Sequence, residues 1–156
     1  MTTLVFVPLD RETAYAVRTG HELEPRPGCA PTAELSASVG PDAVTEEVEF
    51  AALSHAGVLA LTSTTDPLRL VLAADVEAGQ VQEPGHGPGE VVVAGLQWRQ
   101  VQSLFADEPD AAGAVARARA AAQGRTLTEA MDRDEVTDLL DAYDLLWFAP
   151  EELDRC

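Results

Sequence analysis

One segment near the middle of the chain limits what this sequence can fold into. Residues 69–76 read Arg-Leu-Val-Leu-Ala-Ala-Asp-Val and are nearly all apolar until Asp75. An apolar run of this length without alternation is typical of a central strand that is covered on both faces. The chain therefore needs a sheet that places other strands beside this one.

The remaining pattern alternates further strands with amphipathic helices. Strands are predicted at residues 3–8, 32–39, 91–96 and 101–106, and helices at about 10–20, 45–62, 108–124 and 126–149. Pro- and Gly-rich loops are predicted at 24–31 and 83–89. This order indicates a single α+β domain over residues 1–156. We expect a two-layer sandwich in which three to four helices pack on about five mixed or antiparallel strands.

Composition excludes several functional classes. The 156 residues include no Lys, Ile or Asn, and 26 are Ala, a bias that indicates a GC-rich bacterial genome. Without Lys there is no Walker A phosphate loop, no Schiff-base lysine and no anchor for pyridoxal phosphate. The net charge of −17 disfavours nucleic acids and anionic membranes as partners. The protein is thus expected to be acidic, without contact to nucleic acid or membrane.

We find no pattern in the sequence that is typical of a targeting segment or of a metal-binding motif. The apolar residues 4–7 have no basic leader, and no apolar run approaches the roughly 20 residues of a membrane helix. Cys29 and Cys156 have no metal-binding spacing. We expect a cytoplasmic protein with reduced thiols, no metal and no cofactor.

The histidines give no catalytic signature. His21, His55 and His86 form no His-x-x-x-His pair. Ser54 and His55 are neighbours on a predicted helix, where adjacent side chains diverge. The glycine-rich residues 85–89 lack the spacing of a dinucleotide loop, so a flexible hairpin connection is predicted there.

Four charged residues form a candidate pocket. Asp75 ends the most buried predicted strand, and Asp107 and Glu108 stand where another strand gives way to a helix. Carboxylates at strand ends could share a proton or hold a divalent cation, with Arg99 as the counter-charge. Alternatively, the acids at 107–110 stabilise a helix N-terminus, and Arg99 is a surface residue.

The C-terminal part of the chain offers a candidate interface. The apolar stripe of the last predicted helix comprises Val136, Leu139, Leu140, Tyr143, Leu146 and Trp147. With Trp147 in the core, Phe148 would turn away and form an exposed partner surface, or pack beneath the C-terminal tail. The acidic face at 134–141 is either solvated or an imitation of a nucleic-acid backbone.

Four segments together carry a family resemblance. They read Phe-Ala-Ala-Leu at 50–53, Leu-Val-Leu-Ala-Ala-Asp-Val at 70–76, Phe-Ala-Asp-Glu-Pro-Asp at 105–110 and Asp-Leu-Leu-Trp-Phe-Ala at 144–149. The chain resembles an uncharacterised family of short actinobacterial proteins. The resemblance implies a bacterial, cytoplasmic, stand-alone domain and supplies no activity, cofactor or catalytic residue.

Three functional hypotheses follow. The preferred one is a small cytoplasmic accessory or interaction protein without catalysis, binding a protein partner or a second copy of itself. The second is a small-ligand-binding domain or hydrolase that uses Asp75, Asp107 and Glu108 with Arg99, so enzymatic activity stays open. The third is an acidic mimic of nucleic acid.

Overall fold

The apolar segment predicted as a central strand is β3 (Leu70–Glu77), which lies between β1 (Thr2–Pro8) and β6 (Val101–Ala106). The computed structural model describes residues 2–83 and 87–156. Its seven-stranded sheet has the order β4-β5-β2-β1-β3-β6-β7, and every neighbouring pair is antiparallel. The other strands are β2 (Arg26–Cys29), β4 (Val81–Gln82), β5 (Glu90–Val93) and β7 (Leu146–Phe148).

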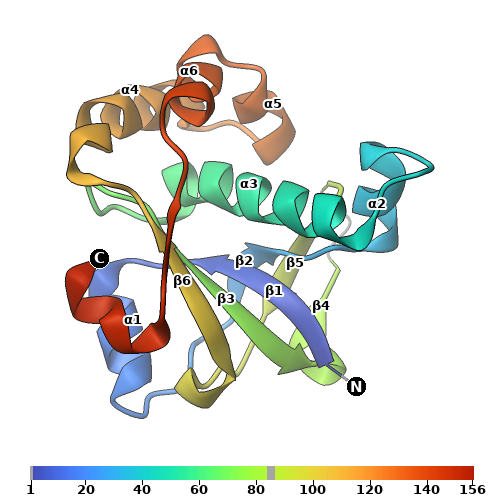
Figure 1. Cartoon of the computed structure of the whole chain (residues 1–156), viewed down its shortest axis with the longest axis vertical. Helices are drawn as coiled ribbons and strands as arrows, with labels where there is room; N and C mark the ends of the chain where they lie inside the picture. Colours follow the sequence, from blue (N-terminus) through green and yellow to red (C-terminus); the bar gives the residue numbers. More distant parts are fainter. Residues whose placement is uncertain (1, 84–86) are drawn as a thin grey trace.

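Helices cover both faces of this sheet. On one face, α3 (Thr45–Ser63) crosses the strands, with α4 (Ala112–Ala122), α5 (Leu127–Met131) and α6 (Asp134–Ala142) gathered beyond it (Figure 1). We call this the α3 face. On the other, the α1 face, α1 (Arg11–Arg18) and the 3-10 helix η4 (Pro150–Arg155) pack on the strands.

Alternation along the strands separates the core into two parts. Val5 and Val7 of β1 point to the α1 face, and Phe6 between them points to the α3 face. The α+β class is therefore confirmed, as is the central strand covered on both sides. The predictions of two layers, about five strands and three to four helices are corrected to seven strands and six α-helices in the described residues, with helices on both faces of the sheet.

The segment 32–39 is a helix and not the predicted strand. α2 (Ala33–Val39) begins after Thr32, whose Oγ1 accepts a hydrogen bond from the Leu35 amide at 3.1 Å. The apparent alternation depends on Ala and Ser, which fit either structure, and only Leu35 is buried. The nearby strand is instead β2, inside the predicted Pro-rich loop. Gly28 is required there, because a Cβ would lie 2.9 Å from the Phe6 carbonyl oxygen.

The last predicted helix ends seven residues early. α6 stops at Ala142, Tyr143 has an extended backbone, and Leu146–Phe148 pairs with β6 as the edge strand β7. Pairing gives the backbone of these residues hydrogen-bond partners and lets their side chains alternate between the two faces. The predicted capping box before α5 is confirmed, since Thr126 and Glu129 exchange hydrogen bonds of 2.9 and 3.2 Å.

The short connecting elements complete the described chain. They are η1 (Ala78–Gln80), η2 (Trp98–Gln100) and η3 (Pro109–Ala111). No helix in residues 2–83 and 87–156 has the length and apolar character needed to cross a membrane.

Polar side chains fix the connection between α3 and β3. Asp10 accepts hydrogen bonds from the Thr65 and Asp66 amides, each at 2.8 Å. Arg119 of α4 donates to the Asp66 carbonyl at 2.8 Å, and Arg11 of α1 donates to the Leu68 carbonyl at 2.9 Å. These contacts join both faces of the sheet to the segment that leads into Arg69.

Candidate functional site

A buried ion pair joins the ends of β3 and β6. Arg69 precedes β3 and Asp107 follows β6, and the two side chains are 1% and 0% exposed. The Arg69 backbone N and Nε each donate to Asp107 Oδ2, at 2.9 and 2.8 Å, and Nη2 donates to Oδ1 at 2.8 Å. The Asp107 amide donates back to the Arg69 carbonyl at 3.2 Å. This two-pronged, charge-assisted geometry holds the guanidinium in one orientation.

The third nitrogen of that guanidinium lies beside a pocket. Arg69 Nη1 takes part in none of the hydrogen bonds found in the described residues. A Cβ on Gly57 would lie 3.1 Å from Nη1, so this glycine lets the arginine approach α3. The pocket has a volume of about 210 Å³. We call it the Arg69 pocket; its lining residues are Phe50, Leu53, Ser54, Gly57, Arg69, Leu140, Tyr143, Asp144 and Leu145.

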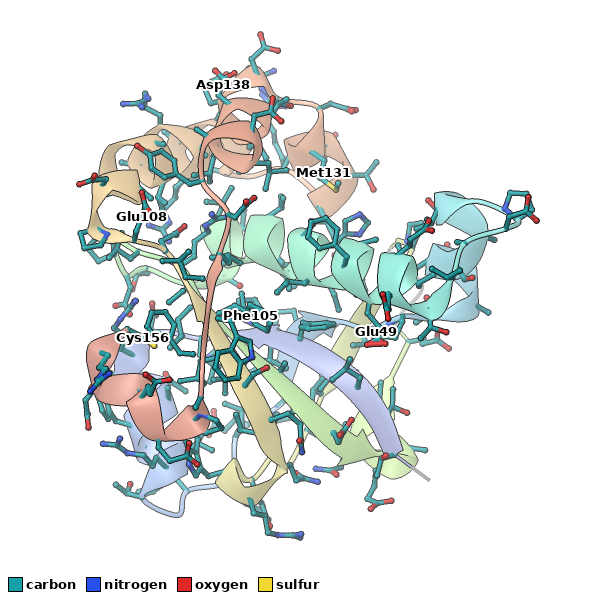
Figure 2. The ribbon with its side chains drawn as sticks, in the orientation of Figure 1. Glu49, Phe105, Glu108, Met131, Asp138 and Cys156 are labelled. Atoms are coloured by element: carbon teal, nitrogen blue, oxygen red, sulfur yellow. The ribbon has the colours of Figure 1, made fainter. Side chains whose placement is uncertain are left out.

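A second hollow continues from this pocket along α3. This aromatic groove, of about 270 Å³, lies between α3 and strands β1, β3 and β6 and shares Phe50 and Leu53 with the Arg69 pocket. Its lining residues are Leu4, Phe6, Glu49, Phe50, Leu53, Ala73, Gln102, Ser103 and Phe105. Figure 2 shows Phe105 on β6 below α3, and Glu49 on α3 itself.

Aromatic side chains lie in the groove and beside it. Phe6 and Phe105 meet edge to face with their ring centroids 6.4 Å apart. Trp147 of β7 is the direct partner of Phe105, so both side chains lie on the α3 face. Phe50 and Trp147 are 67% and 62% exposed. The α3 face thus leaves two large aromatic side chains open to solvent, Phe50 in the groove and Trp147 beside Phe105.

The four residues of the predicted pocket do not meet in one cleft. Asp107 is enclosed by its pair with Arg69, and Asp75 is opposite Leu4, six positions further along β3. At about 3.3 Å per residue, that separation is on the order of 20 Å. Glu108 begins η3 without a side-chain capping bond. Arg99, in η2, is exposed and donates to Gln97 Oε1 at 2.8 Å.

The helix N-terminus alternative fits the positions of Glu108 and Asp110 in η3, but the side chain of Asp107 has another partner. Its carboxylate binds Arg69 and not the amides of the following helix, whose first turn holds Asp110. For the predicted interface, the roles of the two aromatic residues are reversed. Trp147 is the exposed one, and Phe148 is half-buried against the core of the α1 face, because both belong to a strand.

In the described residues, no three His, Cys, Asp or Glu side chains gather as metal ligands. His55 donates a hydrogen bond to the Pro88 carbonyl, and its Nδ1 is buried without a partner in the described chain. Burial lowers the pKa of His55, because it disfavours the charged ring. His86 and the start of the glycine-rich segment 85–89 lie outside the described residues.

The acidic residues of α6 point outward. Asp134, Asp138 and Asp141 are exposed, and Figure 2 shows Asp138 at the outer end of the helical layer. The Arg69 pocket and the groove lie on the inner side of that layer, where Leu140 lines the pocket.

Comparison with protein families gives one match. A family described as "Family of unknown function (DUF6912)" matches residues 3–156. The chain belongs to DUF6912. The predicted membership of an uncharacterised family is therefore confirmed, and the DUF6912 match includes Arg69, Asp107 and every residue that lines the groove. Neither a curated protein nor a solved structure matches the chain.

Sequence reasoning missed Arg69, Gly57, Phe50 and Phe105 as site residues. One signal was available, because Arg69 stands directly before a strand that is otherwise apolar. A charge beside a buried segment needs a buried partner, and Asp107 directly after another strand was a candidate. The pairing of these two residues required the strand order.

Proposed function

We propose that this DUF6912 protein is a non-catalytic, cytoplasmic interaction domain that binds a partner protein through the aromatic groove. The observation that carries the proposal is the exposure of two large aromatic side chains on one face: Phe50, which lines the groove, and Trp147, the β7 partner of the groove residue Phe105. Aromatic residues at the centre of an apolar patch are frequent sources of binding energy in interfaces. Free Cys29 and Cys156 agree with a reducing compartment.

Charge supports a basic segment of another protein as the occupant. The chain carries a net charge of −17, Glu49 lines the groove, and the exposed Asp144 lies at the adjoining pocket. A second copy would bring the same negative charge to the interface, and like charges oppose association. An apolar side chain flanked by Arg or Lys matches both the groove and its surroundings.

Synthetic peptides test this proposal directly. The probes are two fluorescein-labelled peptide pools with random apolar residues at three central positions, flanked by Arg in one pool and by Glu in the other. We expect the Arg-flanked pool to bind, with fluorescence polarisation as the readout. Phe50→Ala and Trp147→Ala should each weaken binding by about tenfold, the equivalent of about 1.4 kcal/mol.

Val44→Ala is the matched control. Val44 is also a large exposed apolar side chain, 56% exposed, but it is not among the groove residues. Its removal should leave the affinity unchanged. Equal binding of the Glu-flanked pool, or affinity that does not respond to Phe50→Ala and Trp147→Ala, would overturn the proposal. A homodimer that Trp147→Ala dissociates in sedimentation would assign the groove to a second copy and refute the basic partner.

A further inference from the structure

The Arg69 pocket has a hydrogen-bond donor at its base without an acceptor. Arg69 is 1% exposed, and Asp107 occupies Nε and Nη2 but leaves Nη1 toward the pocket beside Gly57. Nη1 is not among the buried atoms without a partner in the described residues, so this nitrogen stays accessible to solvent although most of the side chain is enclosed. A ligand atom in the pocket that accepts a hydrogen bond would take the place of solvent at this donor.

The other residues that line the pocket indicate the size and the polarity of such a ligand. Leu53, Leu140 and Leu145 line the pocket with apolar carbon, and Ser54 and Asp144 add polar groups. An apolar cavity of about 150 Å³ is known to hold one benzene ring. The volume of about 210 Å³ therefore suits a small molecule with a branched or cyclic apolar part.

The charged residues at the pocket indicate whether the accepting group of the ligand is charged or neutral. Asp107 already neutralises Arg69, with Oδ2 and Oδ1 at 2.8 Å from its nitrogens. A carboxylate ligand would add an unpaired negative charge next to Asp107, and Asp144 at the pocket adds another. Burial of an unpaired charge is costly, whereas an uncharged carbonyl needs only the donor.

We propose that the Arg69 pocket binds a small uncharged primary amide. Its carbonyl oxygen accepts from Arg69 Nη1, its NH₂ group donates toward Asp144 or Ser54, and its apolar part contacts the leucines. This ligand site differs from the surface proposed for the partner because its polar groups are Arg69, Ser54 and Asp144, although Phe50 and Leu53 line both hollows. It adds a small-molecule function to the same face.

Three molecules of nearly equal shape test the proposal: 3-methylbutanamide, 3-methylbutanoate and 3-methylbutylamine. They differ in charge and not in the apolar part. Each is titrated into ¹⁵N-labelled protein while amide shifts are recorded. We expect the amide to shift Gly57, Asp144 and Leu145 with saturation, and the acid and the amine to bind at least about tenfold more weakly, as for a lost or unmatched buried hydrogen bond.

Two glycine variants separate the pocket from general effects of substitution. In Gly57→Ala, the added Cβ would lie 3.1 Å from Arg69 Nη1 and 3.4 Å from Leu145 Cδ1, so amide binding should be lost. Gly113→Ala, on α4, is the matched control. The one atom that its Cβ would approach is Nη1 of the exposed Arg117, at 3.4 Å. This control should bind the amide like the parent protein.

Further variants keep the test decisive if Gly57→Ala unfolds. Ser54→Leu fills the pocket from a half-buried position and should also abolish the amide shifts. Asp107→Asn removes the neutralising charge and should reverse the preference toward the carboxylate. Tighter binding of the acid or the amine by the parent protein, no saturable shift with the amide, or unchanged shifts in folded Ser54→Leu would overturn the proposal.

Discussion

The two faces of the sheet use the same strands in different ways. On the α1 face, side chains such as Val7, Leu72 and Leu104 are fully buried beneath α1 and η4. On the α3 face, Phe105 is only partly buried, and Phe50 and Trp147 stand in solvent around the groove. The first face is a closed aliphatic core, and the second is a core with an opening along one side of α3.

This difference indicates that the α1 face contributes mainly to stability, whereas the α3 face is open for binding. The strand side chains of the α1 face are closely packed and closed to water, so we assign them a structural role. The open face combines exposed apolar surface with a polar donor, Arg69 Nη1, that has no acceptor in the described residues, and such a combination is typical of binding sites. We therefore expect substitutions on the two faces to affect different measurements.

The largest effect should follow removal of the buried pair that borders the open face. Asp107→Ala leaves Arg69 charged and without a partner, and loss of one member of such a pair costs about 3–5 kcal/mol. Asp75→Ala removes a half-buried carboxylate on β3 and should lower the free energy of unfolding by less than about 1 kcal/mol. Urea unfolding of the two variants measures the difference. Equal losses would show that Asp107 has no special structural role.

Leu72 and Phe50 compare the faces directly. Leu72 is 0% exposed on the α1 face, and a buried Leu→Ala change costs about 2–5 kcal/mol. Phe50 is larger but 67% exposed, so Phe50→Ala should change the free energy of unfolding by only about 0.5 kcal/mol. Thermal and urea unfolding provide the measurement. A large loss in Phe50→Ala would mean that the groove is a part of the folding core and not a binding surface.

The sequence was informative where burial extends over many consecutive residues. The central strand, the long α3 and the helix after Pro109 could be predicted, because their apolar patterns are long and their boundaries carry Pro, Gly or acidic residues. Short elements could not be predicted in this way. β2 contains Pro27 and Gly28, and its strand character comes from pairing with β5 and β1. The pattern at 32–39 matched both a strand and a helix.

The candidate site depended on contacts between distant parts of the chain. Asp107 was identified as a residue at a strand end, but its partner Arg69 is 38 positions away and was treated only as the first residue of a strand. The groove lies between α3 and strands β1, β3 and β6, and the exposed Trp147 stands beside Phe105 on β7, a segment that was predicted as helix. Exposure of Trp147 could therefore not be derived from local periodicity.

A smaller effect should appear with pH. Burial lowers the pKa of His55 below its ordinary value of 6.5, so below pH 6.5 the unfolded chain takes up a proton that the folded chain resists. The free energy of unfolding should therefore fall as the pH drops from 6.5 toward the lowered folded pKa. Urea unfolding between pH 7.5 and about pH 5 should show this slope, weaker in His55→Gln. His21→Gln, at an exposed position, should keep it.

The two cysteines test whether the openness of the α3 face is general or confined to the groove. Cys29 belongs to the α3 face but is 0% exposed, and burial raises its pKa to about 12. Cys156 packs at the edge of the α1 face, half-buried. Because the thiolate is the reactive form, a disulfide reagent should label Cys156 in the native protein and Cys29 only after unfolding. Fast native labelling of Cys29 would mean that the α3 face opens as a whole, and the contrast between a closed and an open face would then reflect motion of α3 instead of a fixed groove.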